Sequence, residues 1–142
     1  MKRSSAQLLL VTALVFGEST MMAVPIDTAL VNGERLYRNY CQRCHGTNGE
    51  GSFNILRSDV WAKQPTDLVK VIAFGARGPS SSGKGYHRAM PPAPYNDAEI
   101  AQVAMYAMQT IGRREVVLSE AEVRRTRQLH LDSIQRKIKS RR

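Results

Sequence analysis

The sequence predicts a small all-α protein, because its apolar residues repeat at helical spacing and do not alternate as they would in strands. In three stretches, apolar side chains recur at steps of three and four residues, which places them on one face of a helix. The glycine- and serine-rich segment 77–85 is expected to be a loop. No stretch alternates apolar and polar residues for long enough to indicate a strand. The 142 residues leave room for one domain with appendages at its ends.

The three main helices each have sequence signals for their ends. The first is expected at about residues 28–44. The second should begin at an N-cap on Thr66, just after a proline, and stop at Gly75. The third should begin at residue 96 or 97, where both Asn and Asp are good N-caps, and end at Gly112. These limits predict a domain over residues 25–112.

Residues 1–24 have the character of a secretory signal peptide. A positive start, Met1-Lys2-Arg3, precedes an apolar run over 8–16 that is too short to cross a bilayer comfortably. The cleavage site stays open between the region of Gly17 and that of Ala23. A buried N-terminal helix and an uncleaved anchor are the alternatives. Export predicts a periplasmic protein, secreted across the inner membrane.

The positive charge lies mainly at the C-terminal end. The whole chain carries a formal +9, yet residues 113–142 hold ten Lys or Arg against four Asp or Glu, a net +6, and 25–112 hold nine against seven, a net +2. Such a tail does not indicate a nucleic-acid-binding face. Residues 113–142 are expected to form a basic extension, either helical, with Ser119 and Glu122 as a capping box, or solvated and disordered. Docking to an acidic partner or an anionic membrane surface is the functional hypothesis for it.

Cys41, Cys44 and His45 form a C-x-x-C-H motif, and the chain has no other cysteine. This spacing lets two thiols form thioethers with one haem while the adjacent imidazole binds its iron. A zinc site would need His87 and His130 as further ligands. A redox-active thiol pair would follow a strand in an alternating strand–helix pattern, which the sequence lacks. We therefore expect one covalently bound haem c.

A covalent haem would supply much of the core of so small a domain. Apolar side chains after the motif are expected to pack on it together with the inner faces of the first and third helices. They are Leu56, Val60, Trp61, Leu68 and Ile72.

Met90 is the expected second axial ligand. It precedes Pro91, which restricts the Met90 backbone to an extended conformation, and it lies far enough along the chain to reach the opposite haem face. His87 is the alternative ligand. Met105 and Met108 lie within a helical apolar stripe, where methionine usually fills the core. A Met ligand would give a higher reduction potential than a second His.

The chain resembles class I monohaem bacterial cytochromes c over about residues 28–112. The resemblance rests on Gly33-x-x-Leu36-Tyr37-x-x-x-Cys41-x-x-Cys44-His45-Gly46, the turn Gly49-x-Gly51, Met90-Pro91, and Asp97-x-Glu99-Ile100-Ala101-x-Val103-Ala104-x-Tyr106. The stretch 61–112 is similar to the haem domains that serve periplasmic alcohol-type dehydrogenases. The resemblance implies the small cytochrome c fold, with Gly33 allowing the first and third helices to cross closely beside Tyr37 and Tyr106. Arg57 and Trp61 are weaker candidates for contacts with the haem propionates.

Family members are electron carriers, so the resemblance implies electron transfer with no catalytic residues. The expected partners are redox proteins such as a periplasmic dehydrogenase, a cytochrome or an oxidase, and the chain would be a monomer or a complex subunit. Permanent assembly into a dehydrogenase complex is the second hypothesis. A haem enzyme or gas sensor is the third; it would need an open iron, with His87 and Arg88 as the nearby polar groups.

Overall fold

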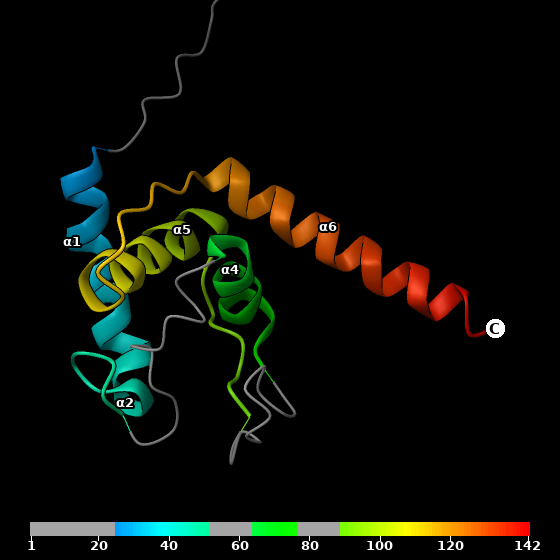
Figure 1. Cartoon of the computed structure of the whole chain (residues 1–142), viewed down its shortest axis with the longest axis horizontal. Helices are drawn as coiled ribbons and strands as arrows, with labels where there is room; N and C mark the ends of the chain where they lie inside the picture. The colour runs from blue at the N-terminus through cyan, green and yellow to red at the C-terminus, as the bar shows by residue number, and fades with distance from the viewer. Residues whose placement is uncertain (1–24, 52–63, 77–88) are drawn as a thin grey trace, which may run out of the picture.

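The protein is described from a computed structural model, which covers residues 25–51, 64–76 and 89–142. In these residues the regular structure is helical, apart from one isolated antiparallel bridge between Ala76 and Met90. This confirms the predicted all-α fold (Figure 1). The elements are α1 (Ile26–Leu36), η1 (Tyr37–Cys41), α2 (Gln42–His45), α4 (Pro65–Phe74), α5 (Asp97–Tyr106), η2 (Ala107–Ile111) and α6 (Glu120–Lys139).

Several sequence expectations lie outside the described residues. These are the signal segment 1–24, the loop 77–85, and Leu56, Arg57, Val60, Trp61, His87 and Arg88.

The first predicted helix is continuous, but one of its turns is widened. α1 passes into the π-helical turn η1, and α2 follows directly. The helix ends at Gly46, whose positive φ of 76° suits a residue without a Cβ. Single π turns inside α-helices occur often at functional sites. Here the widened turn ends at Cys41, the first residue of the C-x-x-C-H motif.

α1 and α5 cross at Gly33. A Cβ on Gly33 would overlap the carbonyl oxygen of Gln102 and lie 2.8 Å from the Cβ of Tyr106. Beside the crossing, the rings of Tyr37 and Tyr106 lie 5.5 Å apart. Ile100 of α5 is fully buried in the same core. The close crossing expected at Gly33 is therefore present.

α4 begins two residues earlier than predicted. Its N-cap is Gln64, and Pro65 occupies the first helical position, so the expected N-cap on Thr66 is wrong. Proline favours the first turn because its fixed φ matches the helix and its missing N–H would have no partner there. The predicted stop at Gly75 is confirmed by a φ of 75°. α4 packs its buried side chains, Leu68, Val69 and Ile72, into the shared core.

α5 begins as predicted. The side chain of Asn96 accepts a hydrogen bond from the N–H of Glu99, and the Glu99 carboxylate accepts one from the N–H of Asn96. Such a reciprocal capping box satisfies backbone donors that the helix cannot pair internally. η2 then continues the helix to Ile111, next to the predicted stop at Gly112.

The C-terminal extension contains a 20-residue helix, α6, which starts at the predicted capping box of Ser119 and Glu122. Its first half packs across α4 and α5, with Val123 fully buried (Figure 1). Arg127 donates to the Asp97 carboxylate at 2.7 Å, and the His130 ring lies 4.4 Å from that of Phe74. This half of the extension therefore belongs to the domain core. Within the described ranges, no helix combines the length and the apolar character needed to cross a bilayer.

Ser119→Ala should lower the free energy of unfolding by about 1 kcal/mol, because it removes the side-chain acceptor for the Glu122 N–H. Hydrogen bonds from the backbone N–H and hydroxyl of Ser119 hold the pKa of Glu122 below its ordinary value of 4.5. A lowered folded-state pKa stabilises the protein above that ordinary value, and the stabilisation is lost as pH falls through the lowered pKa. Urea unfolding should therefore show the difference between Ser119→Ala and wild type at neutral pH and a smaller one in acid.

Ser140→Ala is the matched control. Ser140 lies at the other end of α6, where its exposed hydroxyl donates to the Lys137 carbonyl. Its loss should cost no more than a few tenths of a kcal/mol. Equal destabilisation by the two variants would contradict the role given to the cap.

Candidate functional site

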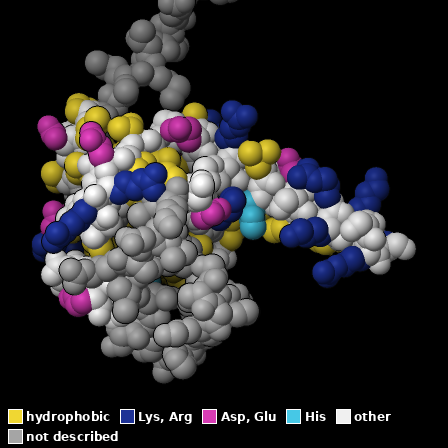
Figure 2. All heavy atoms as spheres, viewed as in Figure 1, with side chains coloured by type: hydrophobic (Ala, Val, Ile, Leu, Met, Phe, Trp, Pro, Cys, Tyr) yellow, Lys and Arg dark blue, Asp and Glu magenta, His cyan; other side chains and the backbone are white. Residues whose placement is uncertain are grey.

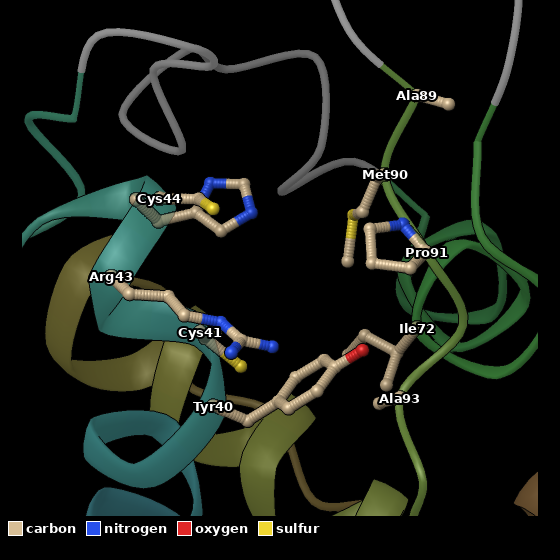
Figure 3. Close-up of a pocket in the computed structure, with 10 residues that line it drawn as sticks. Tyr40, Cys41, Arg43, Cys44, Ile72, Ala89, Met90, Pro91 and Ala93 are labelled. Atoms are coloured by element: carbon tan, nitrogen blue, oxygen red, sulfur yellow. The ribbon is translucent and has the colours of Figure 1, made fainter.

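A cavity of about 250 Å³ lies between α2 and the segment that carries Met90 (Figure 3). In Figure 3, Cys41, Cys44 and Met90 direct their sulfur atoms into it from opposite walls. The cavity thus brings together the four predicted site residues from two segments far apart in the chain. Its lining consists of Tyr40, Cys41, Arg43, Cys44, His45, Ile72, Ala89, Met90, Pro91 and Ala93.

One wall of the cavity is the end of the first helix. Cys41 is half-buried, Cys44 is exposed and His45 is 8% exposed, and the two thiols are not joined in a disulfide. Cys41 and Cys44 are three positions apart, and residues at this spacing lie on the same helix face. The helical backbone therefore presents both thiols to the same space.

The turn after the motif is closely packed against it. Gly51 donates its N–H to the His45 carbonyl at 2.7 Å, and a Cβ on Gly51 would overlap the Cys44 carbonyl oxygen. The Tyr37 hydroxyl donates to the Gly46 carbonyl at 2.8 Å. Burial raises the pKa of Tyr37, so the hydroxyl keeps its proton and remains a donor. These contacts fix the backbone that carries His45.

The opposite wall is attached to the C-terminal end of α4. Met90 exchanges both backbone hydrogen bonds with Ala76, at 2.9 and 3.0 Å, and Ala93 donates its N–H to the Ile72 carbonyl at 2.8 Å. A Cβ on Gly75 would overlap the Met90 carbonyl oxygen. Gly75 therefore ends α4 and also allows the Met90 backbone to pass close to it.

Two tyrosines join the walls. The Tyr40 hydroxyl donates to the Pro92 carbonyl at 3.0 Å, and the Tyr95 hydroxyl donates to the Leu36 carbonyl at 2.8 Å. Their rings lie 5.9 Å apart, edge to face. Neither role could be predicted from the sequence, because each bond joins positions more than 50 residues apart and has no local signal.

The environment of Cys41 does not suit thiol redox chemistry. Burial raises its pKa to about 11, although the nearby Arg43 guanidinium acts in the opposite direction. Reactive thiols of redox pairs have lowered pKa values, because the thiolate is the reacting form. Arg43 also lies over the Tyr40 ring, 4.6 Å from its centre. Cys41 is thus a neutral thiol facing the cavity.

The other predicted ligand candidates are placed differently. Met105 and Met108 are 4% and 2% exposed in the core and do not line the cavity. His130 lies on α6 against Phe74. Among the described residues, no three His, Cys, Asp or Glu side chains gather into a group that could hold a metal ion, as a zinc site would require.

The family model described as cytochrome c oxidase, cbb3-type, subunit III matches residues 28–106. The match spans more than half of the chain, including the motif, the residues that line the cavity and all of α5. The chain belongs to this family. It contains a cytochrome c-type domain, which implies haem c binding and haem-based electron transfer. A search among curated proteins gave no match.

The cavity of this cytochrome c-type domain has donors and walls that fit a haem. Two thiols and an imidazole stand on one side and a thioether on the other, which are donor types that haem iron and haem attachment use. Between them, Ile72, Pro91 and Ala93 supply apolar contacts. The porphyrin is a large apolar body, so such walls favour its burial.

Tyr40→Phe should lower the free energy of unfolding of the cytochrome c-type domain by about 1 kcal/mol, because it removes the hydroxyl that joins η1 to Pro92. Urea denaturation measures the change. Tyr106→Phe is the matched control, since the described residues give that hydroxyl no hydrogen bond, and its effect should stay within a few tenths of a kcal/mol. A loss at Tyr106 as large as that at Tyr40 would show that the destabilisation does not come from the Tyr40–Pro92 hydrogen bond.

Proposed function

We propose that this protein is a periplasmic electron carrier with one haem c, which passes electrons from a dehydrogenase or respiratory donor to a downstream acceptor. The observation that carries the proposal is the cavity, because it sets the C-x-x-C-H motif and Met90 on facing walls. The apolar segment at 8–16 after a positive start supports export, and export supports thioether formation outside the cytoplasm.

Four residues would hold the haem. Cys41 and Cys44 would form the two thioethers, His45 would be the proximal axial ligand and Met90 the distal one. When bound, the haem supplies an iron that cycles between Fe(II) and Fe(III). A soft thioether opposite an imidazole favours a higher potential than two imidazoles would.

The chain contributes to electron transfer by keeping the surroundings of the haem unchanged between oxidation states. The Ala76–Met90 bridge and the Tyr40–Pro92 hydrogen bond restrain the distal wall. The turn at Gly46 and Gly51 restrains the proximal wall. A site held from both sides would need little rearrangement when its charge changes.

A permanent place in an enzyme complex is the second candidate. The family description names an oxidase subunit. An association with an alcohol-type dehydrogenase is proposed on the sequence resemblance of residues 61–112 alone. Both associations would use the same haem domain. Purification of the native protein under mild conditions discriminates them: a free carrier elutes alone, and a subunit elutes with oxidase haem and copper or with a dehydrogenase cofactor.

A haem enzyme or gas sensor would need an open distal position. Met90 directs its side chain into the cavity, which supports a closed iron. The ferrous protein should therefore bind carbon monoxide slowly or not at all at neutral pH. Rapid, stoichiometric binding would favour the sensor or enzyme.

Met90→Ala should abolish the methionine-to-iron charge-transfer band of the ferric protein and allow added imidazole to bind, because the thioether is the proposed sixth ligand. Absorption spectroscopy with an imidazole titration measures both effects. Met105→Leu and Met108→Leu are the controls, since these side chains are buried away from the cavity and a volume-conserving swap is tolerated in a core. Retention of the band in Met90→Ala would show that another residue is the sixth ligand of the iron.

The native protein should contain one haem that stays with the polypeptide in acidified acetone. Redox titration should follow a single one-electron Nernst curve, at about 59 mV per tenfold change in the ratio of oxidised to reduced protein. Replacing Cys41 and Cys44 together by Ser should release the haem into the solvent. Haem that remains attached in that double variant, or a second redox step, would contradict the proposed site.

A further inference from the structure

The last part of the C-terminal extension, residues 131–142, projects beyond the helices that hold the first half of α6 (Figure 1). Val123 and Thr126 are the buried residues of α6, and both lie before this distal segment. Arg127 and His130 make the last described side-chain contacts of α6 with the domain, to Asp97 and Phe74. The distal segment therefore leaves the domain as a helix whose base is firmly anchored.

One face of the distal segment is apolar and uncovered within the described chain. Leu131, Ile134 and Ile138 are 46%, 39% and 49% exposed. Their spacing of three and four residues places them in one row along the helix. Ile134 and Ile138 continue the side of α6 on which Val123 and His130 meet the domain. The face of α6 that packs on α4 and α5 therefore continues beyond the part that these two helices cover.

The same segment is strongly basic. It holds five Lys or Arg and a single acid, Asp132. Figure 2 shows the Lys and Arg side chains gathered around the projecting end of the molecule. At 100° per residue within α6, Lys137 lies on one side of the apolar row and Lys139 on the other, and Arg141 and Arg142 follow the end of the helix. Long basic side chains beside an apolar row can reach phosphates while their stems stay in apolar surroundings.

We propose that the distal segment docks the protein on an anionic phospholipid surface, with Leu131, Ile134 and Ile138 at the boundary of the acyl chains and the basic side chains on lipid phosphates. A basic amphipathic helix binds a membrane interface by adding apolar burial to electrostatic attraction. The described cavity lining includes no residue of α6, so docking through this segment does not use the haem site.

The size and charge of the distal segment favour a lipid surface over a protein partner or a second copy of this chain. Three half-exposed side chains offer far less than the roughly 800 Å² that each partner buries in a standard protein interface. A second copy would bring the same cationic segment, and like charges repel. A lipid surface requires no complementary groove, and its attraction grows with each Lys or Arg that reaches it.

The test uses the haem-loaded protein and vesicle flotation. Vesicles of phosphatidylcholine alone are compared with vesicles that also contain phosphatidylglycerol. The wild type should bind the anionic vesicles at least about tenfold more tightly, and added salt should weaken this binding because it screens the charges.

Two variants separate the contribution of the basic side chains from that of the apolar row. Replacing Lys137 and Lys139, which flank the apolar row, by Gln should weaken binding to anionic vesicles about twenty-five-fold, at roughly fivefold per charge. Replacing Leu131, Ile134 and Ile138 by Gln should weaken it at least about tenfold. Gln is a good helix former, so far-ultraviolet circular dichroism and the haem spectrum should match the wild type.

Leu129→Gln is the matched control. Leu129 is 56% exposed, at least as much as the residues of the row, but it lies about 180° around α6 from Ile138. The affinity of the Leu129→Gln variant for anionic vesicles should stay within about twofold of the wild-type value.

Three results would overturn the proposal. The first is equal binding of wild type and the basic variant to anionic vesicles. The second is absence of wild-type binding to those vesicles at low salt, including the case in which the protein binds an acidic protein instead. The third is a dimer in sedimentation equilibrium that the apolar variant abolishes, which would assign the row to a second copy.

Discussion

The close crossing of α1 and α5 at Gly33 is the constraint on which the rest of the structure depends. Any side chain there would overlap the Gln102 backbone, so the two helices could not approach as they do. α4 and the first half of α6 pack on α5, and α1 leads through η1 into the C-x-x-C-H motif. The crossing therefore sets the position of one cavity wall relative to the elements that support the other.

The two walls are held together by polar contacts between distant parts of the chain. Gly75 allows the Met90 backbone to pass beside the end of α4, and Ala76 pairs with Met90. Tyr40 and Tyr95 then connect this segment to the first helix. Each bond adds modest stability, but together they define the cavity width. That width determines whether the Met90 sulfur and the His45 imidazole could bind the iron of one haem from opposite sides.

Sequence reasoning worked best where the signal was local. The helical repeats, the start of α5 at residue 96 or 97, the capping box at Ser119 and the stop at Gly75 all depend on residues close together in the chain. It placed the start of α4 wrongly at Thr66, because both Pro65 and Thr66 are favourable near a helix start and local preference did not separate them. The widened turn η1 had no sequence signal, since a π turn depends on the packing of the helices around it.

The sequence by itself determined the chemistry of this protein: a C-x-x-C-H motif, a Met-Pro pair and a basic amphipathic extension are properties of adjacent residues. Only the tertiary structure decided that Met90 faces the motif across a cavity, while Met105 and Met108 fill the core. It also decided that the first part of the extension joins the core and that residues 131–142 project from it. These outcomes depend on contacts between residues far apart in the chain, and the energies of such contacts are set by packing that local patterns do not encode.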